Sequence, residues 1–231
     1  MLLSILLQVP VDSVSAAAAA ATTAETPTNT LWDLAIKGGV IMIPIGIMGI
    51  LAIYLSIERW MTINKAARID ANFMSGIRDM VLNDNIIGAQ TLCSRTNTPI
   101  ARMVEKGISR IGKPIHDIDS SMENVGRMEI YKIEKNVGFL STIAGLAPMF
   151  GFLGTIFGVI QMFYKISLAN SIQIDTISGG LYVKMVSSAA GLILGIFAFA
   201  CYHYLTLKID RVANKMEAYK LEFIDILQQP A

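Results

Sequence analysis

Residues 136–164 read NVGFLSTIAGLAPMFGFLGTIFGVIQMFY, a run without a charged side chain. Two further runs, 38–57 and 185–207, share this property. A helix needs about 20 apolar residues to cross roughly 30 Å of hydrocarbon, and each run is long enough. A soluble protein could bury such helices in a large core, but three separate runs favour membrane spans. The sequence therefore predicts an all-α membrane protein with three transmembrane helices.

The composition agrees with a membrane protein. Of 231 residues, 53% are hydrophobic and 16% are charged, whereas soluble domains carry about 25% charged residues. The net charge of +1 indicates neither nucleic acid nor an acidic partner. Cys93 and Cys201 lie in a polar region and in the third apolar run, so we expect packing roles rather than a disulfide.

Catalytic chemistry has no support in the sequence. The two histidines, His116 and His203, accompany no paired acids, no nucleophile motif and no set of metal ligands. We therefore expect no enzymatic activity, no metal site and no cofactor.

The basic residues predict the orientation in the membrane. The segment 58–135 holds twelve Lys and Arg and the segment 208–231 holds four, whereas 1–37 and 165–175 hold one each. Basic residues stay preferentially on the cytoplasmic side. We expect the N-terminus outside, 58–135 inside, 165–175 outside and the C-terminus inside.

The chain is expected to divide into seven stretches. Residues 1–30 form an extracytoplasmic tail or, alternatively, a signal-like segment that is cleaved. The others are an amphipathic lead-in and first transmembrane helix (31–60), a cytoplasmic helical region (61–135), the second transmembrane helix (136–164), a periplasmic loop (165–175), the third transmembrane helix (176–207) and a cytoplasmic C-terminal helix (208–231).

Apolar periodicity predicts that the second and third helices extend into a cytoplasmic helical bundle. After Pro114, the residues Ile115, Ile118, Met122 and Val125 recur at helical spacing, and no breaker precedes the second span. We expect one unbroken helix of about 50 residues there, roughly 75 Å long. The third span continues in an a/d pattern. Its members are Leu205, Ile209, Val212, Met216, Tyr219, Phe223 and Ile226.

Small residues recur on one face of the second and third spans. They are Ala144, Ala147, Gly151, Gly154 and Gly158 in the second, and Ser188, Gly191, Gly195 and Ala198 in the third. Such faces let helix backbones approach closely in lipid. The two faces either pack only against each other or also line an inner surface shared by several subunits. Pro148 interrupts the second span and removes the hydrogen bond to the carbonyl of Ala144.

Few polar side chains accompany these faces. The hydroxyls are Thr142, Thr155, Ser187 and Ser188. Lys184 is the only charged residue inside a span, and it either faces protein or water or extends outward to the interface. No acidic residue lies within the spans, so a proton-driven mechanism would need a carboxylate from a partner.

A family resemblance rests on two motifs. Residues 147–158, APMFGFLGTIFG, resemble the second-span signature A-P-x-x-G-L-x-G-T-x-x-G of the MotA/TolQ/ExbB proton-channel family and depart from it only at Phe152. Residues 187–192, SSAAGL, resemble the family's third-span pattern. The order of spans, the orientation and the large segment between the first two spans also match, over residues 30–228.

The resemblance implies a function. Such proteins form a homo-oligomeric ring, commonly a pentamer, in the bacterial inner membrane. The ring surrounds single-span helices of an ExbD-like partner that carries the proton-binding Asp, and it works on a TonB-like protein. The channel-lining hydroxyls carry over to Thr155 and Ser188. The acid that many members have before the third-span hydroxyl is missing here, where the chain reads Tyr182-Val183-Lys184. Size and the N-terminal extension favour an ExbB-like protein; the alternatives are a TolQ-like subunit of the Tol system and a non-conducting scaffold.

Overall fold

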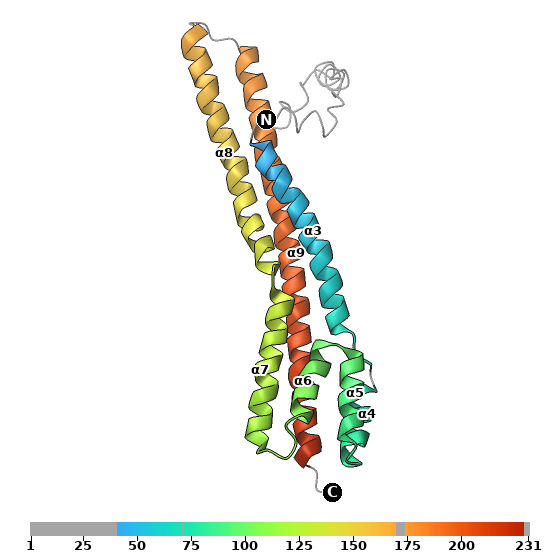
Figure 1. Cartoon of the computed structure of the whole chain (residues 1–231). Helices are drawn as coiled ribbons and strands as arrows, with labels where there is room; N and C mark the ends of the chain where they lie inside the picture. The colour runs from blue at the N-terminus through green and yellow to red at the C-terminus, as the bar shows by residue number, and fades with distance from the viewer. Residues whose placement is uncertain (1–40, 71, 170–173, 229–231) are drawn as a thin grey trace, which may run out of the picture. The chain divides into compact units, whose positions relative to one another are not determined.

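The computed structural model describes residues 41–70, 72–169 and 174–228, all within one unit, Gly38–Ala231 (Figure 1). These residues form helices and no strand. The helices are α3 (Met42–Ala67), α4 (Phe73–Leu82), α5 (Ile86–Thr96), α6 (Pro99–Ile108), α7 (Ile115–Glu134), α8 (Val137–Ala169) and α9 (Ile174–Gln228). Three of them, α3, α8 and α9, are long and apolar enough to cross a membrane. The predicted all-α fold with three transmembrane helices is confirmed.

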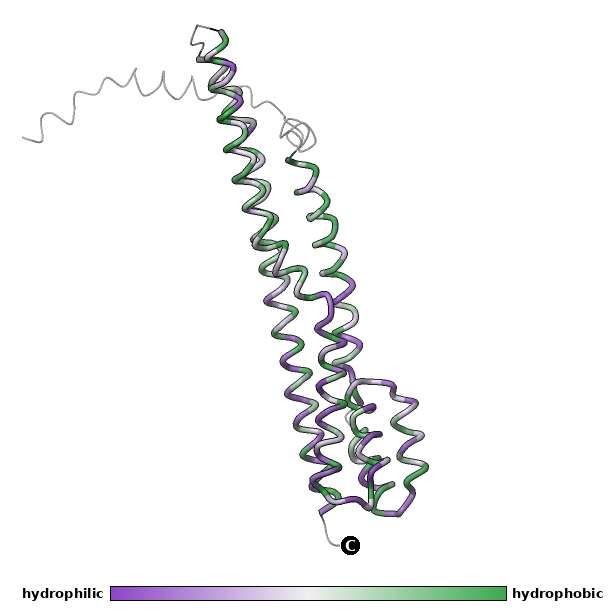
Figure 2. The backbone as a smooth tube through the Cα atoms, turned by 60° about the vertical axis from the view of Figure 1, so that its left-hand side comes forward, coloured by the Kyte–Doolittle hydropathy of each residue, from purple (hydrophilic) through white to green (hydrophobic). Residues whose placement is uncertain are grey.

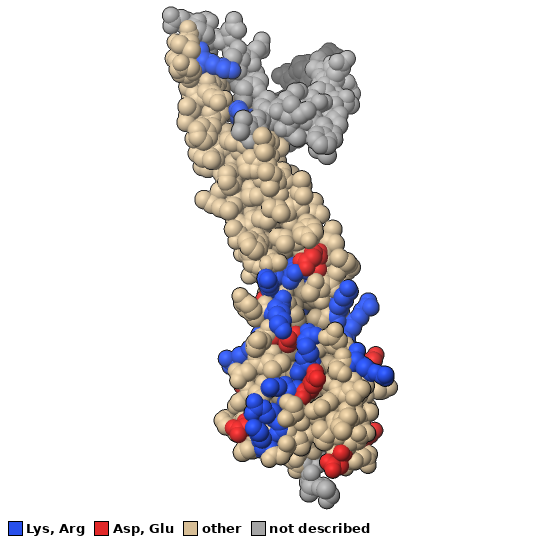
Figure 3. Space-filling view, viewed as in Figure 1, with Lys and Arg blue, Asp and Glu red and all other residues tan. Residues whose placement is uncertain are grey.

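Helix α9 organises the unit, because α3, α4, α6, α7 and α8 all contact it and α5 packs on α4 and α6. Its 55 residues measure about 80 Å at 1.5 Å per residue. Along one part of its length α9 lies against α8 and α3, and along the other part against α7 and α6 (Figure 1). Figure 2 shows more green, for hydrophobic residues, along the first part and more purple, for hydrophilic residues, along the second. Lys and Arg gather over the second part in Figure 3.

Local signals start the short helices. The side chain of Asn85 accepts a hydrogen bond of 3.0 Å from the amide of Gly88 and caps α5. Thr98 accepts one of 3.3 Å from Ala101, and Pro99 is the first residue of α6. Asn and Thr are favoured caps, and Pro suits the first helical position.

The a/d pattern of α9 forms the centre of the bundle formed by α4–α7. Its members Leu205, Ile209, Val212, Met216, Phe223 and Ile226 are buried, and Tyr219 is half-buried. Gly107 of α6 brings three helices together, since a Cβ there would lie 2.6 Å from the sulfur of Met122 and 2.7 Å from a ring atom of Phe223. Burial of a Phe side chain contributes about 1.5–3 kcal/mol, so this contact stabilises the bundle substantially.

The expectation of one unbroken helix from Pro114 to the second span is wrong. α7 ends at Glu134, Lys135 is extended, and Asn136 has φ +70° before α8 begins at Val137. Asn is one of the few residues that adopts the left-handed region at small cost, which explains why the break falls there. The α9 helix, by contrast, is unbroken as expected.

The helices that hold the predicted spans run beyond the predicted bounds. α8 continues to Ala169 and α9 begins at Ile174, so both enter the predicted loop 165–175. α3, which holds the first span, continues past Trp60 to Ala67. The predicted tail 1–30 and lead-in 31–37 lie outside the described residues.

Candidate functional site: the interface between α8 and α9

Glycines of α8 face the backbone of α9. A Cβ on Gly151 would lie 3.1 Å from the carbonyl oxygen of Ser187 and 3.1 Å from the Cα of Ser188. A Cβ on Gly154 would lie 2.8 Å from the hydroxyl oxygen of Ser187. These spacings leave no room for a methyl group, so the two backbones approach as closely as glycine allows.

Glycines of α9 face α8 in return. A Cβ on Gly191 would lie 2.5 Å from the carbonyl oxygen of Ala147 and 3.0 Å from the Cα of Gly151. A Cβ on Gly195 would lie 2.5 Å from the ring of Pro148 and 3.1 Å from the carbonyl oxygen of Ala144. That oxygen is the one that loses its helical partner to Pro148. The small faces of the two spans therefore pack against each other within one chain.

Lys184 lies across the same interface. A Cβ on Gly158 would lie 2.1, 2.4 and 2.8 Å from the Cγ, Cδ and Cε atoms of Lys184. The aliphatic stem therefore occupies the space that a side chain at position 158 would need, and the residue is half-buried. The stem of this lysine therefore packs against the neighbouring helix.

The four hydroxyl residues fall into two groups. Ser187 is buried in the interface and donates a 2.8 Å hydrogen bond to the carbonyl oxygen of Lys184, and Ser188 is half-buried beside it. Thr155 is partly exposed and donates to the carbonyl oxygen of Phe152 at 2.6 Å. Thr142 is exposed and donates to that of Gly138 at 3.2 Å. The two serines therefore lie between α8 and α9, whereas the two threonines are partly or fully exposed on α8.

A second feature, which sequence reasoning missed, lies where α7 meets α8. Arg59, at the end of the first apolar run, is buried, forms an ion pair with Glu58 and donates a 2.9 Å hydrogen bond to the carbonyl oxygen of Lys135. A cation near the last carbonyls of a helix is favourable because these oxygens lack helical partners. The available signal was Asn136, a residue tolerant of left-handed backbone, directly after the charged end of α7.

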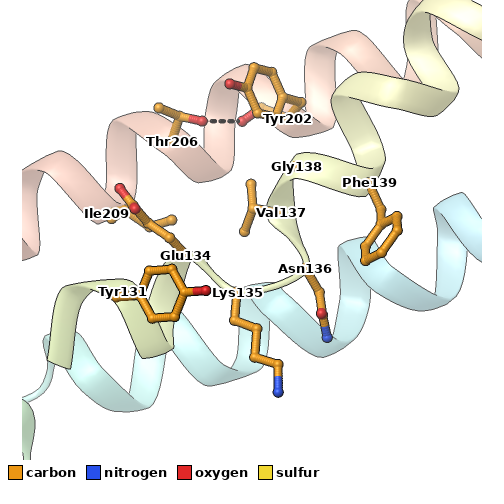
Figure 4. A pocket seen from close by; sticks show the side chains of 10 residues that line it. All are labelled: Tyr131, Glu134, Lys135, Asn136, Val137, Gly138, Phe139, Tyr202, Thr206 and Ile209. Carbon is orange, nitrogen blue, oxygen red and sulfur yellow. Dashed lines mark hydrogen bonds between the residues drawn. The ribbon is translucent and has the colours of Figure 1, made fainter. Parts of the chain in front are cut away.

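A cavity of about 530 Å³ adjoins this break (Figure 4). Tyr131, Glu134 and Val137 line it from α7 and α8, and Tyr202, Thr206 and Ile209 line it from α9. Lys135, Asn136, Gly138 and Phe139, at the break itself, complete the lining (Figure 4). The cavity therefore adjoins the backbone that the Arg59 contact supports.

Charged pairs hold α6 and α9 to α7. Glu129 of α7 is buried and accepts hydrogen bonds from Arg102 of α6 at 2.9 Å and from Lys132 at 2.6 Å. Burial by itself raises the pKa of the Glu129 carboxyl, but the two hydrogen-bonded cations outweigh it and hold the pKa below the ordinary value. Lys220 of α9 pairs with Asp119 of α7 at 3.4 Å.

Three apolar spans, two of which meet through glycine and serine and lead into a helical bundle, define a multi-pass membrane protein built on close helix contacts. A model of the MotA/TolQ/ExbB proton channel family matches residues 95–218, more than half of the chain. The chain belongs to the MotA/TolQ/ExbB proton channel family. The family resides in the cytoplasmic membrane and works with ExbD- or TolR-like proteins, and its members are transporters rather than enzymes.

Individual relatives are distant. The chain is 22% identical over 194 residues to a biopolymer transport protein ExbB homolog of Methanothermobacter thermautotrophicus, covering 83% of this chain and 68% of that protein. It is 24% identical over 183 residues to an ExbB-like biopolymer transport protein of Synechocystis, covering 78% and 72%. It is 26% identical over 103 residues to the Tol-Pal system protein TolQ of Haemophilus influenzae, covering 45% of each.

Proposed function

We propose that this chain is the ring-forming subunit of an ExbB-like, proton-driven motor. In this proposal several copies, commonly five, surround the single-span helices of an ExbD-like protein whose Asp takes the proton. Proton flow then turns or tilts one part against the other and does work on a TonB-like protein. The N-terminus is periplasmic and the C-terminus cytoplasmic, as the distribution of Lys and Arg favours.

One observation carries the proposal: the spans bear hydroxyls but no carboxylate. The segments Met42–Ile57, Val137–Leu168 and Lys184–Leu207 contain no Asp or Glu. Hydroxyls can hold water or relay a hydrogen bond, but they do not titrate near neutral pH. Proton transfer in the membrane needs a titrating group, so in this proposal it comes from a second chain.

The hydroxyl residues have different roles in this proposal. Ser187 is occupied in the α8–α9 interface, and Ser188 is half-buried next to it. Thr142 is exposed and Thr155 is partly exposed, so both hydroxyls are available to a helix of another chain, and the signature at 147–158 favours Thr155. We assign Thr155 to the lining of the proton pathway, with Thr142 and Ser188 farther from the point of transfer and Lys184 setting the charge beside it.

Purification from native membranes in mild detergent tests the proposal. A co-purifying small protein with one span and an intramembrane Asp supports it, and the external domain of that protein separates a TonB-type from a Tol-type system. The TolQ match gives the Tol system as the second candidate. A ring without such a partner would contradict the motor and favour a non-conducting scaffold.

Proton uptake by vesicles that contain the chain and its partner tests the role of Thr155. Thr155→Val deletes the hydroxyl at nearly constant shape, so proton flux should fall while the complex stays assembled. Ser167→Ala is the control, because it removes an exposed hydroxyl from the same helix at a position outside the run 136–164. Undiminished flux in Thr155→Val would remove Thr155 from the pathway.

A further inference from the structure

An apolar groove lies between α3 and α9 at one end of the spans. Its volume is about 220 Å³, and it is lined by Ser56, Ile57, Trp60, Cys201, Tyr204 and Leu205. The hydroxyl of Ser56 donates to the carbonyl oxygen of Ala52 at 2.6 Å, so the one hydroxyl of α3 in this lining is occupied within its own helix. The groove thus offers hydrocarbon-like walls to whatever fills it.

The depth of the groove corresponds to the edge of a bilayer. On α3 it begins in the charge-free run and ends at Trp60, next to the charged pair Glu58 and Arg59. On α9 it ends at Leu205, three residues before Lys208. Trp60 and Tyr204 are each about half exposed, at 47% and 52%. Half-exposed Trp and Tyr are typical of the headgroup level of a membrane.

A fixed cation closes the polar end of the groove. The ammonium of Lys208 donates a 2.7 Å hydrogen bond to the side-chain oxygen of Asn64, 5.5 Å from the Trp60 ring centre and 5.0 Å from that of Tyr204. The hydroxyl of Tyr204 also interacts with this ammonium, which has three donors to share among its partners. Arg211 follows one turn later on the same face of α9.

We propose that this groove binds an anionic phospholipid, with an acyl chain along the groove and the phosphate at Lys208. A phospholipid presents an acyl chain, then glycerol, then phosphate. The site presents apolar walls, then half-exposed aromatic rings, then a cation, in the same order. A basic residue near a membrane surface raises the affinity for anionic lipid about fivefold. This site is independent of the proposed proton transport.

Tryptophan quenching can measure binding at this groove directly. The chain has two Trp residues, so Trp32→Phe leaves Trp60 as the single reporter within the groove. The full chain is placed in two preparations of phosphatidylcholine vesicles that contain the same fraction of a brominated lipid. The brominated lipid is phosphatidylglycerol in one preparation and phosphatidylcholine in the other, and the bromine atoms lie near the headgroup in both. We expect brominated phosphatidylglycerol to quench Trp60 as if enriched about fivefold at the groove.

Variants separate the charge from the groove. Lys208→Gln should lower the enrichment of phosphatidylglycerol over phosphatidylcholine at Trp60 toward a ratio of one, whereas Lys208→Arg should retain the enrichment. Lys135→Gln is the matched control, since Lys135 is an exposed lysine at the α7–α8 junction. Cys201→Phe should fill the groove and reduce quenching by both lipids.

Four outcomes would overturn the proposal. The first is equal quenching by the two lipids in the parent protein, and the second is a preference for phosphatidylglycerol that survives Lys208→Gln. The third is a preference that Lys208→Arg loses as fully as Lys208→Gln does, which would show that Lys208 only holds α3 to α9. The fourth is the absence of quenching by either lipid, which would show that a protein chain, such as a second copy, covers the groove.

Discussion

Arg59 donates a 2.9 Å hydrogen bond to the carbonyl oxygen of Lys135, 76 residues further along the chain. The bond joins the end of the first span to the point where α7 stops and α8 begins. α8 packs on both α9 and α3, so its entry into the membrane is held from two sides.

The first prediction concerns this bond. Arg59→Met keeps much of the aliphatic stem but leaves the Lys135 carbonyl without its charged donor, so we expect the unfolding free energy to fall by about 1–3 kcal/mol. Thermal unfolding in detergent measures the loss, and Arg68→Met, at an exposed site, should change it little. Equal effects of the two variants would show that the contact with Lys135 contributes nothing.

The second prediction concerns the close approach of α8 and α9. Gly191→Ala places a methyl group 2.5 Å from the Ala147 carbonyl oxygen, and overpacking of this kind costs about 1–3 kcal/mol. Gly145→Ala meets nothing within 4 Å and should stabilise α8 by up to about 1 kcal/mol through helix propensity. The two variants should therefore shift the melting temperature in opposite directions, and a shift in the same direction would refute the packing.

The third prediction couples Gly158 to Lys184. Gly158→Ala alone should destabilise the protein, because the methyl group takes the space of the Lys184 Cγ and Cδ atoms. In a Lys184→Ala background that conflict is removed, so the same glycine change should cost little. A double-mutant cycle on thermal unfolding measures the coupling. Additive effects would mean that the lysine stem does not depend on Gly158.

The fourth prediction concerns pH and Glu129. Because its folded-state pKa lies below the ordinary value of about 4.5, its stabilising effect is fully present above that pH and is lost as the pH falls through the lower folded-state pKa. Glu129→Gln should thus destabilise the protein at neutral pH by about 1–3 kcal/mol. The difference between parent and variant should narrow in acid, as urea unfolding at several pH values can show. A pH-independent difference would assign the effect to packing.

The fifth prediction concerns Cys93. Burial, and secondarily the nearby carboxylate of Glu105, raises the pKa of this thiol to about 12, so almost no thiolate exists at neutral pH. In a Cys201→Ser background, maleimide should label Cys93 slowly in the folded protein and rapidly in denaturant. Fast labelling of the folded protein would show that α5 opens readily.

Much of this architecture could be predicted from the sequence because its causes are local. The charge-free runs fix the spans, since hydrocarbon tolerates only long apolar helices. The spacing from Leu205 to Ile226 fixes the buried face of α9, and the turns before Ile86 and Pro99 follow from their capping residues. The signature at 147–158 was sufficient to predict the family.

The tertiary structure decided the features that depend on residues far apart in the chain. Helical periodicity continues through Asn136, and only the fold shows the left-handed backbone there and the Arg59 contact that supports it. The glycine patterns of α8 and α9 predicted close contact without naming the partner, and the antiparallel packing pairs Gly151 with Ser187 and Gly191 with Ala147. The same packing places the Lys184 stem over Gly158. The sequence does not give this contact, because it depends on which residue of α8 lies opposite Lys184.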